Sequence, residues 1–244
     1  MKNTSKGVFK FSILLLIGLV CIFLFLHSSI FNITQFKVQG NKLVSEDEIL
    51  ALAGVKKGEN IFRVNKILTA RSVEVHPMIK KAEIKRQLPS TLLIEVEERR
   101  VWAMIPFQGM FLYVDDEGVC IDRHQQSGSA YPIITMDIYP ERVNLGQRVN
   151  PQAIHLARQV WNLLPEEQRK EISEFHYVNK EKSLILYTLK GTEIRFGREE
   201  RMEEKVQLVL EVMSLEEKME QQGEDVLEYV DIRYKGQPVV KIRT

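Results

Sequence analysis

One uninterrupted apolar segment near the N-terminus is the feature that most restricts what this chain can fold into. From Phe11 to Leu26 the chain carries no charged residue, and apolar residues resume at Ile30 and Phe31. At 1.5 Å of rise per residue, a helix over 11–31 is roughly 30 Å long, which matches the hydrocarbon thickness of a bilayer. The segment therefore predicts one membrane-spanning helix.

The charges that flank this segment predict its orientation. Lys2, Lys6 and Lys10 precede it, and no acidic residue lies before it. Because positive charge is retained on the cytoplasmic side, we expect residues 1–10 to form a short cytoplasmic tail and the rest of the chain to lie outside. A cleaved signal peptide begins in the same order. It usually has a shorter apolar region and an Ala-x-Ala exit, whereas this segment is followed by His27-Ser28-Ser29-Ile30.

The composition of the whole chain excludes several classes of protein. Lys and Arg number 34 against 33 Asp and Glu, so net charge gives no reason to expect a nucleic-acid partner. Hydrophobic residues at 44% and charged residues at 27% are ordinary globular values, which exclude a wholly disordered chain and a polytopic membrane protein. Cys120 is the only cysteine after the apolar segment, so an apolar core has to supply stability.

The segment 32–99 has the pattern of a small α+β domain. A helix is expected between Ser45, which has Glu48 three residues later as in a capping box, and Gly54, a residue typical of helix C-termini. In order along the chain, the predicted elements are a strand at 36–41, helices at 45–54 and 65–75, and strands at 79–85 and 92–97. Two helices covering a three-stranded sheet can bury one core.

From residue 100 onward the pattern changes to short strands, and we expect a mostly antiparallel β domain over 100–244. The predicted strands are at 101–105, 111–114, 118–121, 184–189 and 192–196. Two amphipathic helices interrupt them, at about 150–164 after an Asn150-Pro151 cap and at about 198–220 with many charges outward. Tyr229 begins a further strand pair that ends with the chain.

No pattern typical of catalysis or metal binding occurs in the sequence. The five histidines are scattered singly, and there is no phosphate-binding loop, dinucleotide fingerprint or nucleophile elbow. Asp115-Asp116-Glu117-Gly118 lies between two strand patterns and lacks the alternating spacing of a calcium loop, so we interpret it as a hairpin turn. We therefore expect no enzyme, cofactor, metal or small-molecule substrate, and look for surfaces that bind other chains.

Two features indicate such a surface. The last strand, after Pro238, has nothing following it and is either a sheet edge open to an incoming strand or the second arm of a hairpin paired within the core. Arg198 falls near the start of the predicted long helix, where the helix dipole disfavours a cation. It pairs with an acidic partner, contacts Glu199 or Glu200, or is simply solvated.

Short motifs occur along the chain in an order that is more specific than any one of them. In the first predicted domain they are Phe36-Lys37-Val38-Gln39-Gly40-Asn41, Gly58-Glu59-Asn60-Ile61-Phe62, Leu88-Pro89-Ser90-Thr91-Leu92 and Glu98-Arg99. In the second they are Tyr113-Val114-Asp115 with Gly118, Tyr131-Pro132-Ile133, Gly191 with Phe196-Gly197-Arg198, and Tyr229-Val230-Asp231-Ile232-Arg233-Tyr234. On these motifs the chain resembles the FtsQ/DivIB family of bacterial cell-division proteins.

The resemblance implies a tail at 1–10, a transmembrane helix at 11–31, a POTRA domain at 32–99 and a partner-binding β domain at 100–244. It further implies a non-enzymatic scaffold at the division septum. The implied partners are two kinds of small single-span coiled-coil protein, FtsL and DivIC (FtsB in other lineages), one of which adds a strand to the β domain. Carried onto this sequence, the contact falls on Arg198, Arg233, Tyr234, Gly236, Val239 and Val240.

Other functions stay open at this point. A membrane-anchored POTRA adaptor of another envelope assembly, such as a secretion or sporulation complex, has the same layout. An anchored cell-wall enzyme would need a polar cluster that the sequence does not show. A membrane-barrel translocator would need a series of amphipathic strands, whereas this chain has one apolar helix.

Overall fold

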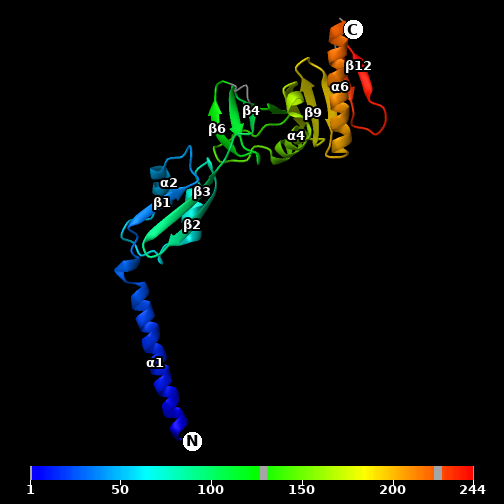
Figure 1. The fold of residues 1–244 in the computed structure, drawn as a ribbon. Helices are drawn as coiled ribbons and strands as arrows, with labels where there is room; N and C mark the ends of the chain where they lie inside the picture. The colour runs from blue at the N-terminus through cyan, green and yellow to red at the C-terminus, as the bar shows by residue number, and fades with distance from the viewer. Residues whose placement is uncertain (1, 127–130, 223–226, 244) are drawn as a thin grey trace. The chain divides into compact units, whose positions relative to one another are not determined.

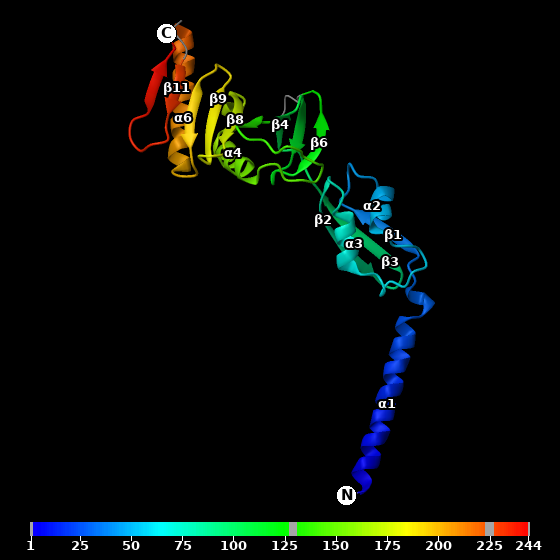
Figure 2. The ribbon, with the colours of Figure 1, turned by 180° about the vertical axis from the view of Figure 1, so that it is seen from behind.

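The computed structural model describes residues 2–126, 131–222 and 227–243. The chain divides into two compact units, Met1–Glu98 and Arg99–Thr244, which Figures 1 and 2 show from opposite sides. Each unit has a separate core of buried apolar side chains. The fold class is α+β, as the sequence predicts.

The apolar segment forms one continuous helix, α1, over Lys2–Leu26. Its stretch Phe9–Leu26 has a mean hydropathy of 2.7 and no residue buried within the chain, so it has the length and composition to cross a membrane. The helix ends earlier than the segment 11–31. Phe31 closes a short 3₁₀ turn, η1 (Ser29–Phe31), and is 7% exposed in the core of the first unit. A single-pass membrane protein fits this arrangement.

The first unit has a three-stranded sheet and two helices, as the resemblance to a POTRA domain implies. Its elements are β1 (Gln35–Gln39), α2 (Glu46–Ala53), α3 (Lys66–Val73), β2 (Ile79–Gln87) and β3 (Thr91–Glu98). The strand order is β1-β3-β2, with β1 parallel and β2 antiparallel to the central β3. The predicted order of strand, helix, helix, strand and strand is confirmed.

Local capping defines where these helices begin and end. The Ser45 hydroxyl accepts a hydrogen bond from Glu48 N (3.2 Å), and Asn65 Oδ1 accepts one from Leu68 N (3.2 Å). At the other end of α2, Gly54 has φ of 66°, a left-handed conformation that glycine adopts without steric cost. The helices therefore start and stop where the sequence predicts, because the signals lie within a few residues of each end.

A carboxylate at the end of β3 connects this strand to the loop between β1 and α2. Glu98 accepts hydrogen bonds from the backbone N–H groups of Lys42 (2.8 Å), Leu43 (3.0 Å) and Val44 (2.9 Å), which precede α2. Partial burial acts to raise the pKa of Glu98, but these donors outweigh it and hold the pKa below the ordinary value. The ionised side chain thus ties the last strand to the loop between β1 and α2.

The second unit contains two sheets and three helices within its described residues. One sheet has the order β4-β5-β6 and the other the order β12-β11-β10-β9-β8-β7. The elements are β4 (Ala103–Phe107), β5 (Met110–Val114), β6 (Cys120–His124), β7 (Ile134–Met136), α4 (Pro151–Leu163), α5 (Glu166–Arg169), β8 (Ile172–Val178), β9 (Ser183–Thr188), β10 (Glu193–Gly197), α6 (Met202–Gln222), β11 (Leu227–Asp231) and β12 (Val239–Ile242). Only β7 with β8 and β10 with β11 pair in parallel, so the sheets are mostly antiparallel.

The turn between β5 and β6 is a hairpin turn, as interpreted from the sequence. Asp115 is fully buried there and forms an ion pair with Arg99. Its other oxygen accepts hydrogen bonds from Glu117 N (2.9 Å) and Val119 N (2.8 Å). The acidic cluster therefore includes a residue that shapes the turn and holds the first residue of the second unit.

One expectation about α6 is wrong. The helix begins at Met202, so Arg198 lies in the loop before it and not in its first turn. Many of its charges point outward, as the sequence predicts, whereas Lys205 (1% exposed) and Glu216 (5% exposed) are buried. Glu216 accepts a hydrogen bond from the Thr188 hydroxyl (2.7 Å), which satisfies its carboxylate inside the unit.

Replacing Glu98 by alanine should destabilise the first unit by about 2 kcal/mol at pH 7, because the backbone N–H groups of Lys42, Leu43 and Val44 lose their charged acceptor. The loss should shrink as the pH falls below the ordinary carboxylate value of 4.5, since a lowered folded-state pKa contributes stability only where the carboxylate is ionised in the unfolded chain. Hydrogen exchange of the core amides of this unit measures the effect. Glu97→Ala, at an exposed neighbour, is the matched control, and an equal loss in both variants would contradict the role of Glu98.

Candidate partner-binding surface

The last strand, β12, lies at the edge of the six-stranded sheet and pairs with β11 alone among the described strands. All four of its residues are exposed, with Val239 at 59%, Val240 at 47% and Ile242 at 50%. Both views of the ribbon show it as the outermost strand (Figures 1 and 2). Of the two arrangements that the sequence leaves open, the structure has the edge strand and not the hairpin inside the core.

An edge of this kind presents backbone groups as well as side chains. In an antiparallel pair, half of the N–H and C=O groups of each strand point away from the neighbouring strand. The outer side of β12 can therefore accept a further strand. Pro238, which has no N–H, stands just before the strand and outside its ladder.

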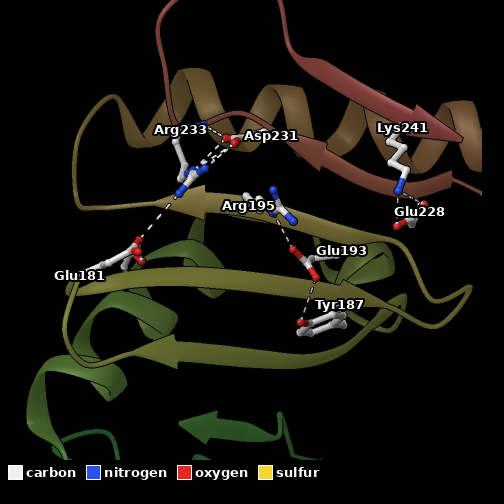
Figure 3. A network of polar contacts seen from close by, with 9 residues as sticks. Glu181, Tyr187, Glu193, Arg195, Glu228, Asp231, Arg233 and Lys241 are labelled. Atoms are coloured by element: carbon white, nitrogen blue, oxygen red, sulfur yellow. Dashed lines mark hydrogen bonds and ion pairs between the residues drawn. The ribbon is translucent and has the colours of Figure 1, made fainter. Parts of the chain in front are cut away.

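The register assigns the side chains of β12 to the two faces of the sheet. Val240 lies opposite Val230, which is 1% exposed, so Val240 extends the buried face to the edge. Lys241 lies opposite Tyr229 on the other face, and its Nζ contacts Glu228 Oε1 (2.9 Å). The strand thus offers an apolar side chain on one face and, on the other, a cation paired with Glu228; Figure 3 shows this pair.

A corner of polar and aromatic side chains follows β11. Arg233 contacts Asp231 through Nη2 to Oδ2 (2.6 Å) and Nε to Oδ1 (3.0 Å), and its Nη1 lies 3.7 Å from Glu181 Oε2 (Figure 3). The hydrogen bonds from Arg233 hold the pKa of Asp231 below its ordinary value, against the opposing effect of burial. Asp231 is the partner of Val239 in the ladder, so this corner adjoins the edge strand directly.

Tyr234 and Gly236 lie in the loop between β11 and β12. The Tyr234 ring is 74% exposed, and the Arg233 guanidinium lies 5.4 Å from its centroid. Gly236 has φ of 124°, a conformation that residues with a Cβ rarely adopt, so the turn itself requires glycine. Gly236 therefore shapes the loop that presents Tyr234.

Arg198 reaches the same corner from the loop after β10. Its Nε donates to the backbone oxygen of Glu181 (2.9 Å), whereas Arg233 lies against the Glu181 carboxylate. On its other side Arg198 lines an open cleft of about 780 Å³ that also includes Lys182 and Arg148. The structure thus brings Arg198, Arg233 and Tyr234 together next to the edge formed by Val239 and Val240.

Two residues that the sequence analysis did not single out hold this corner in place. Lys205 Nζ donates to the backbone oxygen of Arg198 (2.8 Å) and lies 5.0 Å from the Phe196 ring centroid. Arg201 Nη2 donates to the backbone oxygen of Arg233 (3.1 Å). Burial, aided by the nearby Arg201 charge, lowers the pKa of Lys205. Its position three residues after Met202, on the apolar stripe of α6, is the signal that could have identified it.

A row of polar contacts crosses the sheet beside the edge (Figure 3). Glu193 accepts a hydrogen bond from the Tyr187 hydroxyl (3.3 Å) and pairs with Arg195 Nε (2.6 Å). The Arg195 guanidinium lies 4.0 Å from the Tyr229 ring centroid. The polar groups of these side chains are therefore paired with one another.

Within the described ranges, no group of three or more His, Cys, Asp and Glu residues is placed to hold a metal ion.

Comparison with known proteins gives family matches in both units. Residues 31–99 match the model of the POTRA domain, FtsQ-type, and residues 103–233 match the model of the cell division protein FtsQ/DivIB C-terminal region. The second match alone spans more than half of the chain. It ends at Arg233, so β12 lies beyond it.

Named relatives agree with these matches. The chain is 29% identical over 192 residues to the cell division protein FtsQ of Anaeromyxobacter sp. (strain K), covering 77% of this chain and 64% of that protein. It is 25% identical over 216 residues to the cell division protein DivIB of Clostridium acetobutylicum, covering 87% and 84% respectively. It is also 25% identical over 232 residues to the DivIB of Clostridium tetani, covering 94% and 86%.

The two folded units, their order and the apolar helix that precedes them define a POTRA-containing protein of bacterial cell division. The chain belongs to the FtsQ/DivIB family. The predicted family, the fold class and the association with cell division are thereby confirmed.

Replacing Lys205 by methionine should change how stability depends on pH. Between its lowered folded-state pKa and the ordinary value of 10.5, the unfolded chain binds a proton that the fold does not hold, so wild-type stability rises with pH in that window. The stability of wild type relative to Lys205→Met should therefore increase between pH 7 and pH 10. Denaturant unfolding at both values measures the difference.

Lys218→Met is the matched control, because Lys218 lies on the same helix and is exposed. Its stability relative to wild type should be the same at both pH values. A difference between wild type and Lys205→Met that does not change with pH would contradict the assigned environment of Lys205.

Proposed function

We propose that this protein is a non-enzymatic scaffold of the bacterial division machinery that binds two kinds of partner at the septum. The partners are small single-span coiled-coil proteins of the FtsL type and of the DivIC/FtsB type. The helix α1 anchors the chain in the cell membrane, with the N-terminus in the cytoplasm and both folded units outside. The observation that carries the proposal is the exposed edge strand β12 beside the corner of Arg198, Arg233 and Tyr234.

In the proposed complex, a partner segment pairs with the outer side of β12 and continues the sheet. Backbone hydrogen bonds then set the register, and Val240 supplies apolar contact on the buried face. Tyr234, with a ring 74% exposed, supplies an aromatic anchor, and Arg198 supplies charge for an acidic partner residue. Because partners share the membrane with α1, their local concentration is high and modest pairing suffices.

The contacts of the corner support a binding role over catalysis. Asp231 and Glu193 are each engaged by an arginine, Arg233 and Arg195 respectively, at hydrogen-bond distance. A general acid or base needs an ionisable group whose proton is available to a substrate. Here Asp231 and Glu193 brace the sheet edge, while the groups proposed to meet the partner are the Tyr234 ring, the aliphatic side chains of β12 and the cation of Arg198.

Photocrosslinking in living cells tests the proposed site. A photoreactive residue at Val240 should capture small single-span coiled-coil division proteins. Leu145 is the matched control position, because it is 47% exposed, as Val240 is, and its loop is bonded to β6 in the other sheet of the unit. Lys182 would be a poor control, since it lines the cleft beside Arg198. Capture of subunits of another envelope assembly, or equal capture from Val240 and Leu145, would contradict the proposal.

Replacing Tyr234 by alanine should weaken binding of the partner complex about tenfold, which corresponds to about 1.4 kcal/mol for a lost aromatic anchor. The thermal midpoint should not change, because the ring is 74% exposed. Binding of purified partners to the full chain in nanodiscs, measured by interferometry, checks the first point. The control variant Leu145→Ala should bind as wild type does. Unchanged affinity of Tyr234→Ala would show that Tyr234 is not part of the partner-binding surface.

A further inference from the structure

One end of the first unit is tied by hydrogen bonds to the chain segment that leaves α1. Ile33 N donates to Glu59 O, Gly58 N to Ile33 O and Ile61 N to Phe31 O, each at 2.8 Å. Asn60 Nδ2 donates to the carbonyl of Leu26 (2.9 Å), the last residue of the helix. Residues 55–66, which include most of the loop between α2 and α3 and the first residue of α3, are therefore held close to the end of the apolar helix.

The turn between β2 and β3 belongs to the same end. Thr34 N donates to Ser90 O (2.9 Å), and the Thr34 hydroxyl donates to the Ser90 hydroxyl (3.0 Å). We call these three segments, residues 29–34, 55–66 and 86–90, the helix-proximal end. Because they are bonded to one another and, through Asn60, to Leu26, all three lie near the C-terminal end of α1.

Charge at the helix-proximal end is strongly one-sided. Its exposed cations are Lys56, Lys57, Arg63 and Lys66. Glu59 is the acidic residue among these segments, and it is half-buried. A further cation, Arg86, is used internally, since it donates to the backbone oxygens of Ile61 and Val64 (2.8 Å each). The exposed acidic residues of this unit lie outside these segments, at Glu46, Asp47, Glu48, Glu74, Glu83 and Glu97.

Large apolar side chains are exposed among these cations. Ile30 is 58% exposed and Leu88 is 59% exposed, each on a different segment of the helix-proximal end. Ile67 (67%) and Leu68 (57%) follow Lys66 directly in the first turn of α3. Cations mixed with exposed aliphatic side chains are typical of surfaces that lie in the interface of a bilayer, where the aliphatic groups enter the headgroup boundary and the cations meet phosphates.

We propose that the helix-proximal end is a docking surface for the anionic lipid surface of the bilayer that α1 spans. Lys56, Lys57 and Arg63 meet lipid phosphates, and Ile30 and Leu88 enter the headgroup boundary. The proposal rests on the proposed anchoring by α1, and it adds a second contact that holds the POTRA domain against the membrane. Charge complementarity and the hydrogen-bonded connection to Leu26 both favour lipid as the occupant.

Lysine footprinting of the full chain tests the docking surface without any substitution. The protein is placed in nanodiscs of phosphatidylglycerol or of phosphatidylcholine, treated with an amine-acylating reagent and analysed by mass spectrometry. Lys56, Lys57 and Lys66 should react at least threefold more slowly in the anionic discs, whereas exposed Lys42 and Lys81 should react equally in both. Equal rates for the first three in both kinds of disc would overturn the proposal.

A charge-reversed variant gives the second measurement. Lys56→Glu/Lys57→Glu/Arg63→Glu changes exposed side chains only, so the unit should keep its thermal midpoint. In anionic discs the protection of Lys66 should be lost, because the neighbouring cations no longer hold it at the lipid surface. Retained protection of Lys66 in this variant would contradict the proposal.

Lys37→Glu/Lys42→Glu/Lys81→Glu is the matched control, since it makes the same change of charge at exposed positions outside the helix-proximal end. Lys66 should stay protected in it. A soluble polyanion added to phosphatidylcholine discs tests the occupant. If it protects Lys66 as strongly as the anionic discs do, the surface binds a polymer and the lipid proposal is overturned.

Alkaline extraction separates the docking proposal from the proposed anchoring. Release of the chain would refute anchoring by α1, whereas an embedded chain with unprotected Lys56 would refute only the docking.

Discussion

Parallel pairing of β10 with β11 is the constraint on which the rest of the second unit depends. Two parallel neighbours cannot be joined by a tight turn, so the chain has to cross the sheet between them. The helix α6 makes that crossing and packs Val206, Val209 and Met213 into the core. The chain then returns through one short loop and adds β12 outside β11. The edge strand therefore follows from a connection that the core itself requires.

The same crossing explains why charged side chains are buried at the start of α6. The chain has to leave β10 and turn into the helix next to the loop that follows β11. Gly197, with φ of 86°, allows this approach, because a Cβ there would lie 3.0 Å from Arg233 Cγ. Lys205 and Arg201 then donate to backbone oxygens on the two sides of the corner. Buried cations are tolerated here because they satisfy carbonyl groups that regular pairing leaves open.

Features fixed by neighbouring residues could be predicted, and features fixed by distant ones could not. The caps at Ser45 and Asn150 and the left-handed Gly54 depend on a few adjacent residues, and the helices that they bound are where the sequence places them. The strand β7 has three residues and is stabilised by parallel pairing with β8, a partner from far along the chain, so no local pattern marked it. Lys205 is buried because of a carbonyl that only the folded corner brings near.

The two parts of the proposed binding surface would discriminate between partners in different ways. Backbone pairing along β12 accepts many sequences, because every residue except proline carries the same donor and acceptor. The corner is more selective. The Arg233 guanidinium is already paired with Asp231, and it lies against the ring of Tyr234, 5.4 Å from the ring centroid. A partner that reaches the corner can bury the ring without first separating that ion pair, so it avoids the cost of an unpaired charge. Arg198, whose Nε is occupied by the backbone of Glu181, retains other N–H groups for an acidic residue. Selectivity in this arrangement comes from the few side chains at the corner, and the strand supplies register.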